Sequence, residues 1–156
     1  MKTNPSYKIR KATAADIAGM CVILKNDLGY SDCSEEIIKS QFSKLDESRE
    51  AVFVAVRNNT NEDLNANSVL GIIHVEKYNV IYYQEMANLL ALAVSSECRR
   101  LGIGAALLKT AENWAKENGI KLMRLNSGSD RTGAHDFYRS QGYGSEKGQI
   151  RFIKEF

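Results

Sequence analysis

The first third of the chain carries one strand pattern followed by two helix patterns. Tyr7–Lys11 alternates between apolar and polar residues and predicts a short strand. A helix is expected next, opened by Thr13 and Asp16 as a capping box and ended by Gly29. Ser34 is placed to cap a second helix. The apolar stripes of these helices are Ile17, Met20, Cys21, Leu24 and Leu28 in the first, and Ile37, Ile38, Phe42 and Leu45 in the second.

The middle of the chain predicts a hairpin and a buried strand. Ala51–Arg57 and Val69–Tyr78 are rich in β-branched residues and predict two paired strands. Between them, Asn58–Asn67 carries five asparagines and is expected to be an exposed loop. Val80–Glu85 has no clear pattern. Ala87–Val94 is almost wholly apolar, as in a central strand covered on both faces.

The remaining patterns complete a mixed fold. They predict, in order, a helix over Gly102–Asn118 ending at Gly119, a strand over Ile120–Leu125, a helix over Thr132–Gln141 ended by Gly142, and a strand over Ile150–Phe156. This order combines a hairpin meander with a βαβ crossover. We therefore expect an α/β (α+β) fold, in which helices flank a mixed, mostly antiparallel central sheet.

Length and composition point to a single globular domain over residues 1–156. The chain is 44% hydrophobic and 26% charged, which excludes general disorder. Its net charge of only +2, without a basic stripe, argues against nucleic-acid binding. No apolar run is long enough to span a membrane, and the first ten residues lack the apolar stretch of a signal peptide.

The cysteines give no sign of a metal site or a disulfide framework. Cys21, Cys33 and Cys98 are odd in number and widely spaced, and no CxxC pair occurs. We expect free thiols, no bound metal, and a location in the reducing cytoplasm.

The segment with the clearest chemistry lies between the buried strand and the following helix, over residues 97–105. A helix N-terminus presents backbone N–H groups without partners, and its dipole favours an anion. Gly102 and Gly104 allow close approach to this backbone, and Arg99 and Arg100 add permanent positive charge. The segment thus favours binding of a diphosphate, although a simple strand-to-helix turn is the alternative. A Walker loop is excluded because no Lys follows Gly104, and a GxGxxG motif is excluded because position 107 is leucine.

Two segments together resemble the GNAT superfamily of N-acetyltransferases. The pattern Leu92-x-Val94-x-x-x-x-Arg99-x-x-Gly102-Ile103-Gly104-x-x-Leu107-Leu108 is similar to the family's acyl-CoA signature. Downstream, the segment from Ala134 to Tyr143 resembles the family's Ala-x-x-Phe-Tyr-x-x-x-Gly-Phe/Tyr motif. Ser96 stands where many members have proline. Arg131 stands where many have asparagine, and an asparagine occurs instead at Asn126, so either could serve the pantetheine side.

The resemblance implies a GNAT-like acyl-CoA N-acyltransferase fold that transfers an acetyl group from acetyl-CoA to a primary amine of a small molecule or a protein. The amine would attack the thioester directly in a ternary complex. The positions that would hold acetyl-CoA are Leu92, Ala93, Val94, Arg99, Arg100, Leu101, Gly102, Ile103, Gly104, Ala105, Asn126, His135 and Tyr138.

The resemblance also implies catalytic roles. Tyr138 matches the family's tyrosine that protonates the leaving thiolate, and its own pKa would ordinarily lie near about 10. Glu85, just before the central strand, is the first candidate for the general base, with Glu76 or water as alternatives.

The acceptor pocket is expected to involve the loop from Asp27 to Cys33. Its side chains Asp27, Tyr30 and Asp32 could receive a cationic amine, and Tyr78, Tyr82 and Tyr83 could line the opposite wall.

Two other functions compete with catalysis. The same fold could bind acyl-CoA as a non-catalytic regulatory module, or the glycine-containing turn could belong to a purely structural domain. Exposed strand edges would also allow a homodimer.

Overall fold

A computed structural model describes residues 6–58 and 69–156 of the chain. By contacts, the chain divides into two compact units, Met1–Asn126 and Ser127–Phe156. The first unit contains β1 (Tyr7–Lys11), α1 (Ile17–Asn26), α2 (Glu35–Phe42), β2 (Glu50–Arg57), β3 (Val69–Tyr78), β4 (Met86–Val94), α3 (Ile103–Glu117) and β5 (Met123–Leu125), and the second contains α4 (Thr132–Ser140). The predicted Asn58–Asn67 loop lies, apart from Asn58, outside the described residues.

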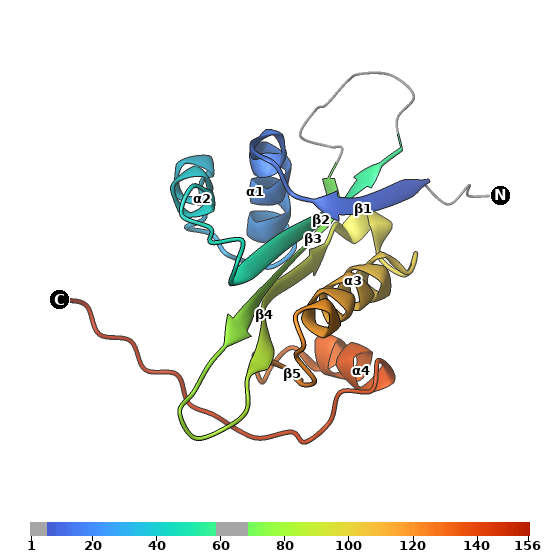
Figure 1. Ribbon diagram of the computed structural model, residues 1–156. Coiled ribbons are helices and arrows are strands. Elements are labelled where there is room, and N and C mark those ends of the chain that lie inside the picture. The colour runs from blue at the N-terminus through green and yellow to red at the C-terminus, as the bar shows by residue number, and fades with distance from the viewer. Residues whose placement is uncertain (1–5, 59–68) are drawn as a thin grey trace. The chain divides into compact units, whose positions relative to one another are not determined.

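The strands form one sheet in the order β1-β2-β3-β4-β5 (Figure 1). Every neighbouring pair from β1 to β4 is antiparallel, and β4 and β5 are parallel. The helix α3 provides the crossover that joins those two parallel strands. The expectation of a mixed, mostly antiparallel sheet flanked by helices is therefore confirmed.

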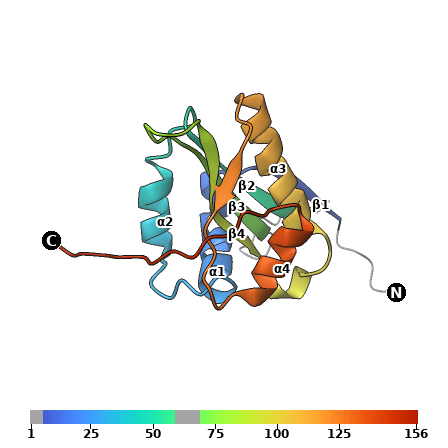
Figure 2. The same ribbon diagram turned by 90° about the horizontal axis from the view of Figure 1, so that it is seen from below.

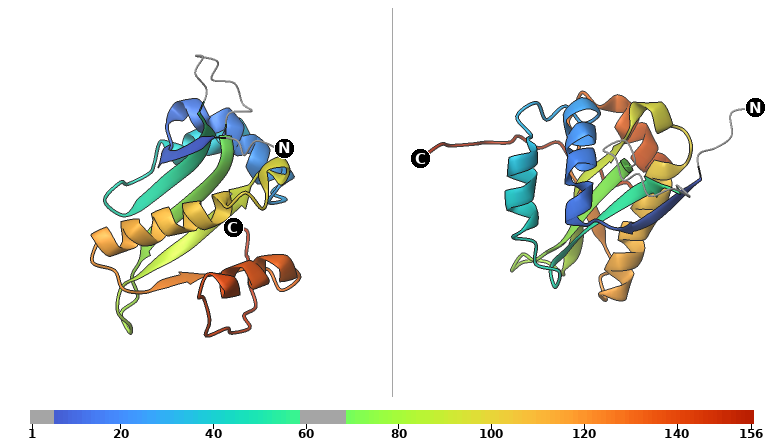
Figure 3. Two further views of the ribbon diagram at one scale, coloured as in Figure 1. Left: turned by 90° about the vertical axis from the view of Figure 1, so that its right-hand side faces the viewer. Right: turned by 90° about the horizontal axis from the view of Figure 1, so that it is seen from above.

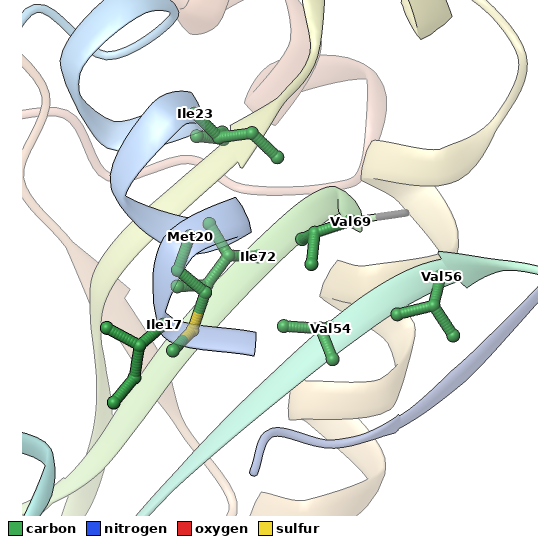
Figure 4. Close-up of a cluster of buried hydrophobic side chains, with 8 residues drawn as sticks. Ile17, Met20, Ile23, Val54, Val56, Val69 and Ile72 are labelled. Atoms are coloured by element: carbon green, nitrogen blue, oxygen red, sulfur yellow. The ribbon is translucent and has the colours of Figure 1, made fainter. Parts of the chain in front are cut away.

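Helices cover both faces of this sheet. Figure 2 shows α1 and α2 on one side and α3 on the other, and Figure 3 shows α3 lying along the sheet. On the first face, Ile17, Met20 and Ile23 of α1 point toward valines and isoleucine of β2 and β3 (Figure 4). Burial of this apolar cluster holds α1 against the sheet.

The beginning of α1 is fixed by a buried carboxylate. The Asp16 side chain is only 3% exposed and accepts hydrogen bonds from both terminal nitrogens of Arg10, at 2.7 and 2.9 Å. It also accepts from the Thr13 backbone N–H at 2.8 Å, which confirms the predicted capping box. Burial would raise the pKa of Asp16, but these hydrogen bonds and the Arg10 charge outweigh it and lower that pKa.

A glycine on β3 allows α3 to approach the other face. A Cβ on Gly71 would lie 2.8 Å from Leu107 Cδ1 and 3.1 Å from the Ala93 carbonyl oxygen. Ile103 and Leu107 of α3, both buried, pack against this position. The absence of a side chain at Gly71 thus sets how closely the first turns of α3 lie to the strands.

Two predicted strands differ from the structure. The strand expected over Ile120–Leu125 forms only at Met123–Leu125, because Ile120 is still bonded to the end of α3 through the Ala115 carbonyl. The strand predicted over Ile150–Phe156 is wrong, since no residue there is in a strand. Alternating apolar residues can give a segment one apolar face, but a strand also needs a neighbouring strand to pair with its backbone groups. The apolar side chains of this segment are not packed either, since Ile150, Phe152 and Phe156 are exposed.

Candidate active site

A row of polar side chains crosses the sheet near the start of β4. The strand registers place Glu50 opposite Glu76, Glu76 opposite Asn88, and Asn88 opposite Arg124. Residues that are opposite one another in neighbouring strands point to the same face. We call these four residues the polar row. It shares its face with the cluster that packs on α1, because Ile72 lies four positions before Glu76 on the same strand.

Hydrogen bonds link the members of the polar row. Asn88 donates through Nδ2 to Glu76 Oε1 at 2.8 Å, and its own Oδ1 accepts from Arg124 at 2.9 Å. Arg124 also donates to Asn126 Oδ1 at 3.3 Å, and its guanidinium lies 4.6 Å from the centre of the Tyr78 ring. Within the described residues, Arg124 is thus bonded to amide oxygens rather than to a carboxylate.

One half-buried histidine adjoins this row. His74 Nε2 lies 3.7 Å from Glu50 Oε2 and is buried without a hydrogen-bond partner among the described residues. Burial lowers the pKa of His74, and the charges of Glu50 and Glu76 oppose this only in part. The net effect of its surroundings thus favours the neutral imidazole.

Beyond the row, β4 has an unpaired edge. β5 pairs with β4 only at Ala87–Leu89, whereas β3 pairs with it along nearly its whole length. A bulge falls at Leu90, because His74 pairs with Ala91 and Val75 pairs with Leu89. On the β5 side, the backbone of Leu90–Val94 has no strand partner among the described residues. An extended ligand could therefore hydrogen-bond to it as an added strand.

The turn after β4 has an unusual backbone. We call residues 95–102, which join β4 to α3, the cofactor turn. Arg100 and Gly102 have φ values of +62° and +78°, in the left-handed region that non-glycine residues rarely adopt. A Cβ on Gly102 would meet nothing within 4 Å, so the backbone at the start of α3 is open to an approaching group. Arg99 and Arg100 are exposed beside it. These features fit a diphosphate group.

One expected acceptor residue has another role. Asp27, which follows α1, is largely buried and accepts a hydrogen bond from the Ser96 backbone N–H at 2.8 Å. Its Oδ1 also lies 3.7 Å from Arg99 Nη2. One oxygen of the Asp27 carboxylate is thus bonded to the cofactor turn, and the expectation that Asp27 receives a cationic amine stays a prediction. Tyr30 and Asp32, farther along that loop, are exposed.

The remaining predicted residues of the first unit lie in the β3–β4 connection, on β3 and directly after β5. Glu85 is exposed in that connection, directly before β4, together with Tyr82 and Tyr83. Glu76 is half-buried in the polar row. Asn126, which follows β5, is bonded to Arg124.

The second unit contains three of the expected residues. Tyr138 is on α4, half-buried, with its ring 5.9 Å from that of Tyr143. Burial raises the pKa of Tyr138, and the charge of Arg131 partly opposes this. His135 Nε2 lies 2.9 Å from the Gly128 carbonyl oxygen. Since a carbonyl only accepts, Nε2 carries a proton, and His135 binds the chain that leads into α4.

Sequence reasoning missed most of the polar row. Glu50, Asn88 and Arg124 of the row, and His74 beside it, were not singled out, although each is a polar residue within a strand. A polar residue on a strand face covered by helices is costly unless it has a partner, so its presence could have indicated a site from the sequence alone. Their mutual contacts depend on register and could not be predicted.

The described residues contain no group of three or more His, Cys, Asp or Glu side chains placed to hold a metal ion. Among the described helices, none combines the length and apolar character of a membrane span.

Comparisons with known proteins identify the family. Residues 17–143 match the model of the acetyltransferase (GNAT) family. The chain is 27% identical to an aminoalkylphosphonate N-acetyltransferase of Salmonella typhimurium, over 96% of this chain and 92% of that protein.

Solved structures agree in fold. An aminoglycoside N-acetyltransferase in complex with CoA has a TM-score of 0.81, with 12% identity over 100% of this chain and 99% of that chain. The glucosamine-6-phosphate N-acetyltransferase of Arabidopsis thaliana has a TM-score of 0.78, with 15% identity over 96% of this chain and 99% of that one.

The match over most of its length shows that this chain belongs to the acetyltransferase (GNAT) family. Its reaction is the transfer of an acetyl group from acetyl-CoA to an amine.

Proposed function

We propose that this enzyme acetylates a small primary amine that also carries an anionic group, with aminoalkylphosphonates as the first candidates. The observation that carries the proposal is the polar row, which offers a half-buried carboxylate, Glu76, and a cation, Arg124, on either side of Asn88. A carboxylate favours an ammonium group, and a guanidinium favours a phosphonate. The relative from Salmonella typhimurium, which acts on aminoalkylphosphonates by its name, also supports this choice.

Acetyl-CoA, which supplies the acetyl group as a thioester, is proposed to bind at the start of α3 and along β4. The N–H groups of Arg100 to Ala105 and the Arg99 and Arg100 side chains would hold the diphosphate. The unpaired edge of β4 at Leu92–Val94 would hydrogen-bond the pantetheine. This placement is supported by the open backbone at Gly102 and by the β5-side edge of β4 at Leu90–Val94, which no described strand covers. Roles for Asn126, His135 and Arg131 at the cofactor remain predictions.

The amine must lose a proton when its nitrogen forms the new bond to the acetyl carbon. We propose that a carboxylate near the start of β4 takes this proton, directly or through water. Glu76 is supported by its fixed position, since Asn88 holds its Oε1 at 2.8 Å. Glu85 remains the alternative, and it is exposed on the β3–β4 connection. As the carbon–sulfur bond breaks, Tyr138 is proposed to donate its hydroxyl proton to the sulfur.

The acceptor test measures release of the CoA thiol with a panel of amines. The panel contains aminomethyl- and aminoethylphosphonate, the corresponding alkylamines without the phosphonate, glucosamine 6-phosphate and an aminoglycoside. We expect the highest kcat/KM for the aminoalkylphosphonates, and at least a tenfold loss when the phosphonate is absent. Equal rates with the plain alkylamines would contradict the anionic part of the proposal.

Variants separate the two candidate bases. Glu76→Gln and Glu85→Gln each remove one negative charge with little change in shape. The variant that lacks the true base should lose about 100-fold or more in kcat, and the acidic limb of its pH–rate profile should disappear. If both variants keep full activity, water alone takes the proton.

The remaining expectations stand as proposals of the same kind. A single domain over residues 1–156 is supported by the family match, which spans residues 17–143. A cytoplasmic location is supported by Cys21, Cys33 and Cys98 as free thiols. Light scattering of the purified protein would test whether it forms a homodimer.

A further inference from the structure

Asp27 joins two segments that lie far apart in the chain. It is the residue at the C-terminal end of α1, and its carboxylate accepts from the backbone N–H of Ser96, 69 residues later. The Asp27 side chain is only 9% exposed, whereas that of Arg99, 3.7 Å away, is 57% exposed. The 2.8 Å bond to the Ser96 N–H is the shorter of the two contacts, and the ion pair with Arg99 is weakened by solvent.

The location of this carboxylate is unfavourable for the helix itself. The C-terminal end of a helix carries partial negative charge, which repels an acidic side chain. Burial adds a cost of desolvation. The contacts that offset both costs are those of Asp27 with Ser96 and Arg99 in the cofactor turn. Asp27 therefore stabilises that turn rather than α1.

The position of Ser96 allows it to influence the conformation of the cofactor turn. It is the first residue of a short 3-10 helix, Ser96–Cys98, which is followed by Arg99 and the left-handed Arg100. Since each of these dihedral angles directs the next part of the chain, holding the Ser96 N–H limits where Arg99 and Arg100 can lie. A proline at this position would have no N–H to hold, but its ring would restrict the backbone directly.

We propose that Asp27 is a positioning residue for acetyl-CoA, which acts by holding the Ser96 N–H and thereby preorganising the cofactor turn. This rests on the proposed role of that turn in binding the diphosphate. Asp27 does not touch the ligand in this proposal. Asp27 raises the fraction of molecules in which the cofactor turn has the conformation that binds the diphosphate. It therefore changes the affinity for acetyl-CoA and leaves the chemical step unchanged.

Four variants test the proposal, with calorimetry of CoA binding and steady-state kinetics as the measurements. Asp27→Ala should raise the Kd for CoA and the KM for acetyl-CoA about tenfold, with kcat within about twofold of wild type. Asp27→Asn retains an oxygen that can accept from Ser96, so its Kd should stay within about threefold. Glu36→Ala removes an exposed carboxylate from α2 and is the matched control, with an unchanged Kd.

The fourth variant tests the mechanism by rescue. Ser96 opens a helical turn, and Ser95 before it is extended, with ψ of 134°, so both positions suit a proline at residue 96. Asp27→Ala combined with Ser96→Pro should therefore recover most of the lost affinity. Recovery of Kd without recovery of the melting temperature would support positioning, because a merely structural role would restore both or neither.

Three results would overturn the proposal. The first is an unchanged Kd for CoA in folded Asp27→Ala. The second is a loss of CoA affinity in Asp27→Asn as large as that in Asp27→Ala. The third is a double variant, Asp27→Ala with Ser96→Pro, that binds CoA no better than Asp27→Ala. Failure of the wild-type protein to bind CoA would be a different outcome, since it would remove the proposed function of the turn itself.

Discussion

Two left-handed residues, Arg100 and Gly102, shape the cofactor turn, and only one of them is a glycine. The strain at Arg100 is of the order of 1 kcal/mol or more and persists only if the surrounding structure or its function compensates for it. A substitution at Gly102 would both strain the backbone and obstruct the proposed ligand. These two effects can be separated, because Gly119, just beyond the other end of the same helix, is also left-handed and provides a control for strain alone.

Gly102→Ala should weaken acetyl-CoA binding, while Gly119→Ala should not. Both glycines have φ near +75°, and a Cβ on either would meet nothing within 4 Å, so both variants should lose about 1 kcal/mol of stability. Only Gly102→Ala places a methyl group on the backbone that is proposed to face the diphosphate. We expect its Kd for CoA, measured by calorimetry, to rise about tenfold or more. Equal Kd values for the two variants would contradict a ligand at Gly102.

Tyr138→Phe should lower kcat by about 10²–10⁴-fold if the phenol protonates the leaving sulfur. Burial raises the pKa of Tyr138, so the protonated form persists above the ordinary value near about 10. The wild-type rate should therefore stay constant through neutral pH and fall only above that value, and the variant should lack this alkaline limb. Stopped-flow measurement of thiol release across pH checks both effects.

A small effect at Tyr138 would reassign this residue. A CoA thiolate is a good leaving group, so a loss under about tenfold is the outcome that would make Tyr138 a packing residue. The ring contact with Tyr143 remains in Tyr138→Phe, so the variant should keep its melting temperature.

Among the elements, α3 packs closely against a single glycine of a neighbouring strand. Gly71→Val should destabilise the fold by about 1–3 kcal/mol or more, because its Cβ would lie 2.8 Å from Leu107 Cδ1 and 3.1 Å from a backbone oxygen. Gly71→Ala should cost less, since the Leu107 side chain can move but the Ala93 carbonyl cannot. Urea denaturation compares the two. If Gly71→Val leaves the unfolding midpoint unchanged, α3 is not packed as closely as the structure shows.

Elements defined by local chemistry were predictable from the sequence. Val69–Tyr78 forms a strand with the predicted bounds, and Ser34 caps α2 by accepting from the Ile37 N–H at 3.2 Å. Gly142 ends α4 with φ of +89°, as expected. In each case the signal lies within a few residues of the feature that it determines.

Features that depend on distant partners were not predictable. Ile150–Phe156 has the pattern of a strand but no partner strand, and only the strand registers place Asn88 between Glu76 and Arg124. Asp27 is the clearest case. Its position in an expected acceptor loop suggested a bond to the amine, but its partner Ser96 is 69 residues away. The sequence therefore predicted a turn between the buried strand and the next helix, with two exposed arginines, but not the carboxylate that is bonded to it. The binding role of this turn stays a prediction.

At the scale of the whole molecule, ligand binding and stability are linked. A ligand that binds only the folded state adds RT ln(1 + [L]/Kd) to the free energy of unfolding, about 2.7 kcal/mol at a concentration of 100 times Kd. For a chain of 156 residues each kcal/mol raises the melting temperature by about 2–4 °C. Saturating acetyl-CoA should therefore raise the melting temperature of the wild-type protein by about 5–10 °C in differential scanning fluorimetry.

The same measurement distinguishes binding at the cofactor turn from a general effect of an anionic ligand. Arg100→Ala removes an exposed charge that is proposed to contact phosphate, so its shift with acetyl-CoA should be smaller than that of wild type at low salt. Because salt screens exposed charges, the difference between the two proteins should narrow as ionic strength rises. Gly119→Ala should melt at a lower temperature without ligand but show the full wild-type shift. A chain in which the turn is only structural would show no shift in any of the three proteins.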